Sequence, residues 1–114
     1  MTNSMLDFEL IHGTFRATID SYKEVPALTD DDNTIIRDAF IAVTLRLDTG
    51  DTIDTRWYSK RIPYILNCLR EQLGDHIYKL SEAIKAAMRT PITVHIDIDS
   101  KYGQQIEYRE EVIR

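Results

Sequence analysis

The sequence predicts a single domain, residues 1–114, of mainly β structure with helices, in the α+β class. Apolar and polar residues alternate along five segments, which is the pattern of half-buried strands. Between the third and fourth of these segments, apolar residues instead recur at helical spacing, most clearly from Ile62 to Leu73. A length of 114 residues suits one domain. The expected order is therefore three strands, a helical connection and two strands.

The first strand is expected over residues 5–22. From Leu6 to Leu10 the apolar residues occupy even positions, and from Phe15 to Ile19 they occupy odd ones. One extra residue in a strand produces such a change of phase, so we expect a β-bulge near His12 and Gly13. A long bent strand of this kind can serve two sheets and is typical of barrels.

Residues 26–34 are expected to form a solvated loop, because they contain a proline and three successive aspartates. The aspartates do not predict a calcium site, since the glycine and the later glutamate of an EF-hand loop are missing.

Residues 39–47 and 53–58 are expected to form a hairpin whose register can be derived. A two-residue turn at Thr49 and Gly50 would set apolar positions against polar ones. A three-residue loop ending at a left-handed Gly50 instead pairs Ile41 with Trp57 and buries one consistent face. This register predicts that Trp57 lies in the core.

The same register leaves aromatic and basic residues on the outer face of the hairpin. Phe40 is expected opposite Tyr58, with Arg46 and Arg56 on the same surface. The two rings form either a binding surface or a cross-strand pair, and the N-terminal segment or another subunit could cover them.

The second half of the chain predicts two helices and two strands. The first helix should run from Ile62 to Leu73, with Ser59 or Ile62 as its cap and Gly74 as its stop. The second should run from Leu80 to Arg89, and the strands should cover residues 92–98 and 104–112. The residues expected to point inward from these last elements are Ile84, Ala87, Met88, Ile106 and Tyr108.

Composition limits the functional classes. A net charge of −5 argues against binding duplex DNA by bulk charge. No apolar run approaches the ~20 residues of a membrane span, and the N-terminus lacks the pattern of a signal peptide. Cys68 is the single cysteine and cannot form an internal disulfide, so a cytoplasmic location is expected.

No enzyme activity, cofactor or metal site is expected. His12, His76 and His95 have neither the spacing of metal ligands nor an evident nucleophile partner. Asp97, Asp99 and Glu107 could share the outer surface of the last hairpin and hold a divalent metal for phosphodiester cleavage, but such acidic residues are common on a solvated strand face.

The order of the elements resembles the OB-fold, a five-stranded Greek-key barrel with a helix between strands three and four. The long first strand bent at Gly13 and the hairpin of strands two and three carry this likeness of topology, which covers residues 6–112. The alternative architecture is an open antiparallel sheet with two helices on one face.

In particular the chain resembles OB-fold single-stranded-DNA-binding proteins of the bacterial phage and mobile-element type. The resemblance implies that the outer face of strands two and three binds single-stranded DNA in an accessory role in replication or recombination. The residues implied to bind are Phe40, Arg46, Arg56, Tyr58, Lys60, Arg61, Lys101 and Tyr102.

A second hypothesis is a protein-interaction module, such as a phage or plasmid accessory protein that binds a host protein. The negative net charge and the aspartates Asp30 to Asp32 favour it. Homodimerisation through Phe40 and Tyr58 is a variant of this hypothesis.

Overall fold

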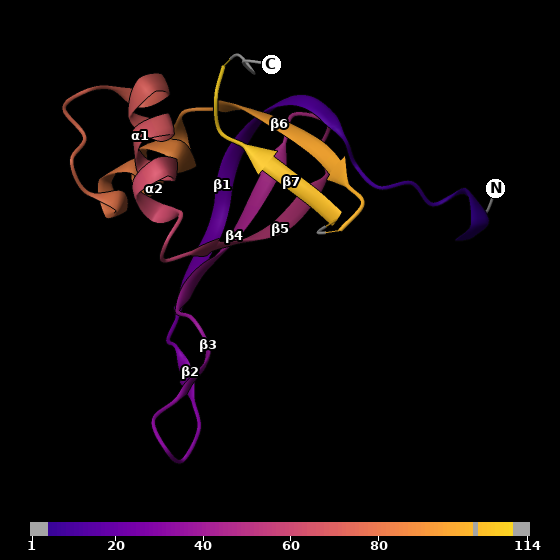
Figure 1. Ribbon diagram of the computed structural model, residues 1–114. Coiled ribbons are helices and arrows are strands. Elements are labelled where there is room, and N and C mark those ends of the chain that lie inside the picture. Colours follow the sequence, from indigo (N-terminus) through magenta and orange to yellow (C-terminus); the bar gives the residue numbers. More distant parts are fainter. Residues whose placement is uncertain (1–4, 102, 111–114) are drawn as a thin grey trace.

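The computed structural model describes residues 5–101 and 103–110, and within them the chain forms seven strands, two α-helices and a short 3₁₀ helix (Figure 1). The strands are β1 (Gly13–Val25), β2 (Leu28–Thr29), β3 (Ile35–Arg37), β4 (Phe40–Leu47), β5 (Thr52–Tyr58), β6 (Ile92–Asp99) and β7 (Gly103–Glu107). The helices are η1 (Met5–Asp7), α1 (Ile62–Leu73) and α2 (Leu80–Arg89). The predicted α+β class is confirmed. None of the described helices combines the length and apolar character needed to cross a membrane.

Five strands form one antiparallel sheet in the order β5-β4-β1-β6-β7, and β2 pairs with β3 separately. Counted along the chain, the strands of this sheet are β1, β4, β5, β6 and β7. The fourth of them, β6, lies beside the first, β1, and β4 and β5 follow on the other side of β1, which is the strand order of a Greek key. Strands β5 and β7 are the two edges. The antiparallel sheet is open, because β5 and β7 do not pair, so the predicted closure into a barrel is not observed.

The sheet is bent so that the β6–β7 hairpin lies across β4 and β5 (Figure 1). Trp57 of β5 and Tyr108, the residue after β7, meet in the core with ring centroids 5.5 Å apart. The indole Nε1–H of Trp57 donates to the Tyr108 hydroxyl at 2.7 Å. Both residues are buried, as predicted, and their contact joins the two edge strands through side chains.

The predicted register of the β4–β5 hairpin is confirmed. Gly50 has a φ of 92°, and its N–H donates to the carbonyl of Leu47 at 2.9 Å, which closes the three-residue turn. Ile41 pairs with Trp57, and Phe40 pairs with Tyr58.

The first strand begins later than predicted. Residues 5–12 are not in a strand, and β1 begins at Gly13, where a φ of 118° turns the chain into the sheet. The change of phase at this glycine therefore marks the start of β1. The register shift within β1 lies between Ile19 and Ser21, at Asp20, and the strand then continues to Val25.

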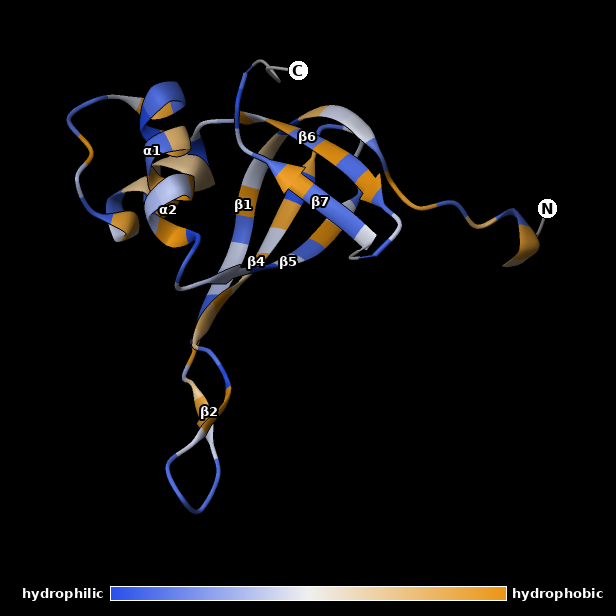
Figure 2. Ribbon diagram, in the orientation of Figure 1, coloured by the Kyte–Doolittle hydropathy of each residue, from blue (hydrophilic) through white to orange (hydrophobic). Residues whose placement is uncertain are grey.

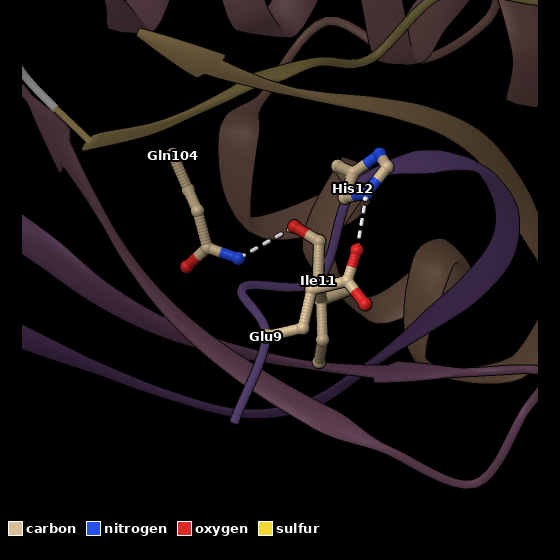
Figure 3. A network of polar contacts seen from close by, with 4 residues as sticks. All are labelled: Glu9, Ile11, His12 and Gln104. Atoms are coloured by element: carbon tan, nitrogen blue, oxygen red, sulfur yellow. Dashed lines mark hydrogen bonds and ion pairs between the residues drawn. The ribbon is translucent and has the colours of Figure 1, made fainter. Parts of the chain in front are cut away.

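The segment before β1 is attached to the body at Ile11. The side-chain amide of Gln104 in β7 donates to the carbonyl of Ile11 at 2.7 Å, and His12 contacts Glu9 at 3.1 Å (Figure 3). Ile11 also packs against the core. The remaining residues, 5–10, project from the body (Figure 1).

Residues 26–39, which we call the arm, project from a different part of the body, at the bottom of Figure 1. The predicted loop is wrong in part, because β2 and β3 pair here as a hairpin. The Asp30 carboxylate accepts from the N–H groups of Asp32 and Thr34, both at 2.9 Å, and this shapes the tip. Figure 2 shows hydrophobic residues along the arm, and Leu28, Ile35 and Ile36 are exposed.

Helices α1 and α2 have the predicted bounds and pack on each other and on the sheet at one end of the molecule (Figure 1). The N-cap of α1 is Arg61, not Ser59 or Ile62. The side-chain amide nitrogen of Gln72 donates hydrogen bonds to the carbonyls of Thr93 and Tyr108, and its oxygen accepts one from the N–H of Thr93, at 2.7–2.9 Å. These hydrogen bonds hold α1 against β6.

Two details at the end of the chain differ from the prediction. Met88 is exposed, because it lies at the flank of the buried stripe formed by Ala83, Ile84 and Ala87 and not at its centre. The last strand ends at Glu107, and residues 111 and 112 of the predicted strand lie outside the described residues.

Candidate nucleic-acid interface

The outer face of β1, β4 and β5 consists of rows of three side chains fixed by the strand register. The two rows nearest the arm are Lys23–Ala42–Arg56 and Val25–Phe40–Tyr58. A hollow of about 340 Å³ lies on this face, and the small side chain of Ala42 lines it together with Phe40 and Arg56.

Phe40 lies on the predicted face but is covered by its neighbours and only 6% exposed. The guanidinium carbons of Arg56 and Arg37 lie 4.5 Å and 5.1 Å from its ring centroid, and the Tyr58 ring lies 5.3 Å away. Cation–π contacts of this kind fix the orientation of arginine side chains. Phe40 is therefore the support of this surface and not the exposed aromatic platform that the sequence suggested.

Tyr58 is the accessible aromatic residue of this group, with 37% of its surface exposed. Its hydroxyl accepts from Nη1 of Arg56 at 3.4 Å. We call Arg37, Phe40, Arg56 and Tyr58 the arginine–aromatic cluster. It contains two cations and one accessible ring.

The end of the same face away from the arm is electrostatically balanced. Nε of Arg46 lies 3.3 Å from Oδ1 of Asp20, the residue at the bulge. The Thr44 hydroxyl donates to the carboxylate of Asp54 at 2.7 Å. Positive charge on the outer face is therefore concentrated near the arm.

Of the remaining residues predicted to bind DNA, Lys60 lies near the cluster, whereas Arg61 and Lys101 lie elsewhere. Lys60 is exposed just after β5, close to Tyr58 in sequence. The Arg61 guanidinium instead lies over the ring of Tyr64 at 5.8 Å. Lys101 lies in the turn between β6 and β7, and Tyr102 lies outside the described residues.

Arg61 belongs to a group around Tyr64 that carries its own negative charge. The Tyr64 hydroxyl donates to Glu107 at 2.8 Å, and this hydrogen bond raises the pKa of Tyr64 to about 12. Arg61 lies 3.8 Å from the same carboxylate, and Arg109 lies over the Tyr64 ring at 5.1 Å. Glu107 thus offsets one of the two cations, and Arg61 is not part of the arginine–aromatic cluster.

Sequence reasoning missed Lys23 and Arg37. Lys23 joins the face because β1 continues past residue 22, and Arg37 joins it because the arm folds back on itself at β3. The Nη2 of Arg37 also donates to the carbonyl of Pro26 at 3.1 Å, which holds the arginine at the base of the arm. No local pattern in the sequence signals that contact.

A pocket of about 540 Å³ adjoins the cluster at the base of the arm. It lies between the end of β1, the start of β4 and the first residues of the two α-helices. Its lining residues are Glu24, Val25, Pro26, Ala39, Phe40, Ile41, Ser59, Ile62 and Leu80. Most of them are apolar, and Glu24 is the charged residue in the set.

Within the ranges 5–101 and 103–110, no group of three or more histidine, cysteine or acidic side chains is arranged to hold a metal ion. Neither a known protein family nor a curated protein matches this chain in sequence. What the structure defines is an antiparallel α+β domain with a Greek-key sheet and a cluster of arginine and aromatic side chains beside an apolar pocket.

Proposed function

We propose that this protein binds single-stranded nucleic acid, DNA in particular, on the outer face of β4 and β5 at the end near the arm. The arginine–aromatic cluster carries this proposal, because it sets two guanidinium groups beside the exposed ring of Tyr58. Its role is that of a cytoplasmic, non-enzymatic accessory protein in replication or recombination.

The proposed mechanism combines stacking with contacts to the phosphates. Stacking of a base on an aromatic side chain contributes ~1–3 kcal/mol to binding, and any of the bases can stack in this way. Tyr58 offers that ring, and Arg56, which lines the hollow over Ala42, contacts the adjoining phosphate together with Lys23 of the same row. Phe40 contributes by holding Arg56 in place.

The proposal includes an OB-fold-like architecture. The Greek-key strand order, the helices between β5 and β6 and the Trp57–Tyr108 contact across the edges all support it. In such folds the outer face of the second and third strands binds oligonucleotides, and the connection between strands one and two flanks it. The arm is that connection here. Its acidic tip repels phosphate, so the strand is expected to bind at the arm's base.

Fluorescence anisotropy of a labelled oligo-dT, measured at low and high salt, tests the proposal. We expect Tyr58→Ala to weaken binding about tenfold or more, because one stacked base is lost. Arg56→Ala should weaken binding and reduce the slope of log K against log salt by about 1. Arg46→Ala is the matched control, since this arginine shares the face but is paired with Asp20 and should change binding little.

Circular dichroism of each variant confirms that it is folded. The proposal fails if the unmodified protein shows no salt-sensitive binding. It also fails if Tyr58→Ala and Arg56→Ala bind as tightly as the unmodified protein.

The exposed apolar residues of the arm favour a second function, recognition of a partner protein. Ile35 and Ile36 lie at the stem of the arm, and Asp30 to Asp32 lie at its tip. Capture experiments from a nuclease-treated lysate should then return a protein that Ile36→Ser no longer retains. Recovery of nucleic acid alone from an untreated lysate would contradict this candidate.

A further inference from the structure

The N-terminal segment, residues 5–10, presents apolar side chains that the chain itself does not bury. Leu6 is 95% exposed and Phe8 is 79% exposed, and Leu10 is also exposed. Burying one such side chain is worth ~1.5–3 kcal/mol, so several in one short segment indicate a surface that another molecule covers. Asp7 and Glu9 lie between them, so apolar and acidic residues alternate along the segment.

The pocket at the base of the arm has the complementary character. Its apolar lining includes Phe40 and Leu80. Arg37 stands at its margin, where it contacts the Phe40 ring and the Pro26 carbonyl, and Lys60 directly follows the lining residue Ser59. Glu24 is the acidic residue of the lining, and Asp38 directly precedes the lining residue Ala39. Lys79, which directly precedes the lining residue Leu80, adds a third cation, so these cations outnumber the two acids. An apolar segment with acidic flanks fits this combination.

The segment and the pocket of one molecule do not face each other. Residues 5–10 leave the body on the side away from the helices, whereas the pocket lies where β1 and β4 meet the starts of α1 and α2 (Figure 1). The hydrogen bond from Gln104 to Ile11 and the packing of Ile11 on the core fix the point from which the segment departs (Figure 3). The segment is thus presented outward, toward a second molecule.

We infer that this pocket binds the N-terminal segment of a second copy of the chain, so that two copies form a homodimer by reciprocal exchange. A twofold dimer makes the same contact twice and closes the assembly. Phe8 enters the apolar pocket of the partner copy, and the flanking acids face Arg37 and Lys60. This inference does not depend on nucleic-acid binding.

Light scattering coupled to size-exclusion chromatography tests the dimer over a range of protein concentrations up to about 1 mM, which covers weak association. We expect a concentration-dependent dimer that Phe8→Asp converts to monomer. Phe8 is exposed, so this substitution should not disturb folding. Tyr78→Asp is the matched control, because Tyr78 is a similarly exposed aromatic (75%) that does not line the pocket, and it should leave the dimer intact.

Site-specific cross-linking tests which surfaces meet. Phe8→Cys in one preparation and Ser59→Cys in another should form a mixed disulfide dimer under mild oxidation, whereas Tyr78→Cys with Ser59→Cys should not. The native Cys68 is buried and should not compete. A protein that stays monomeric at all concentrations overturns the inference. So does a dimer that survives Phe8→Asp or fails to cross-link at these two positions.

Discussion

At the scale of single residues, the buried pair of Trp57 and Tyr108 is a side-chain contact between the two edges of the open sheet, since Trp57 lies in β5 and Tyr108 directly follows β7. Tyr108→Phe keeps the ring but removes the hydroxyl that accepts from the indole N–H. A buried donor left without a partner costs ~1–3 kcal/mol. We therefore expect the free energy of unfolding, measured by urea denaturation, to fall by this amount.

Tyr78→Phe is the control for that measurement, since Tyr78 is exposed and the same hydroxyl is removed there. It should change the free energy of unfolding by no more than about 0.5 kcal/mol. Equal stability of Tyr108→Phe and the unmodified protein would show that the Trp57–Tyr108 hydrogen bond contributes nothing to closing the core.

Tyr108 also predicts a pH dependence of stability. Burial raises its pKa to about 12 in the folded protein, above the value of 10.0 expected of an exposed tyrosine. Its contribution is therefore complete below pH 10 and is lost as the pH rises from 10 toward 12. A difference of about two pKa units corresponds to about 3 kcal/mol. Urea denaturation at a series of alkaline pH values should show this decline.

Tyr64 has a pKa raised in the same direction by its hydrogen bond to Glu107, so it contributes to the same decline. Tyr108→Phe and Tyr64→Phe should therefore each show a shallower decline of stability with alkaline pH than the unmodified protein. An unchanged slope in Tyr108→Phe would contradict the assignment to Tyr108.

Single residues also mark the limit of the prediction from sequence. The alternation of residues 39–58 was enough to pair Phe40 with Tyr58 and to bury Trp57. It could not show that Phe40 is covered, because Arg37 reaches it from the arm. Contacts that follow from the alternation of residues along the hairpin could be predicted. Contacts that form because the arm folds back onto the sheet could not.

At the scale of elements, the β4–β5 hairpin and both α-helices were predictable because short-range chemistry specifies them. Gly50 fixes the turn, and the helical spacing of apolar residues together with Gly74 fixes α1. The start of β1 was not predictable in this way. A change of phase at a glycine is equally the mark of a bulge and of a strand beginning, and pairing with distant β6 decides between them.

The tip of the arm depends on one side chain, the carboxylate of Asp30, which accepts from two backbone N–H groups. Asp30→Ala should open the tip and speed hydrogen exchange at the amides of Asp32 and Thr34. The free energy of global unfolding should change by less than about 0.5 kcal/mol, because the tip is exposed. Asp31→Ala is the control and should leave both amides protected, since neither amide bonds to its carboxylate in the structure.

At the scale of the whole molecule, the core and the arm are separate in composition. The hydrophobic core draws residues from the main sheet, both α-helices and the α1–α2 connection, and no residue from 26 to 39 belongs to it. The arm therefore adds surface without adding core. The order in which the strands meet, and the failure of β5 and β7 to pair, depend on such long-range packing and could not be derived from local patterns.

This separation predicts that the arm can be removed. Val25 and Phe40 are paired at the end of the β1–β4 ladder, so a two-residue Asn-Gly turn can replace residues 26–39 and keep the register. Unfolding in urea should stay cooperative, with a free energy within about 1 kcal/mol of the unmodified protein, because a shorter connection also costs less closure entropy. Loss of cooperative unfolding would show that the arm holds the sheet together. Because the deletion removes Arg37 but retains Arg56 and Tyr58, oligo-dT binding should weaken no more than in Arg37→Ala, whereas complete loss would place the nucleic-acid contacts on the arm itself.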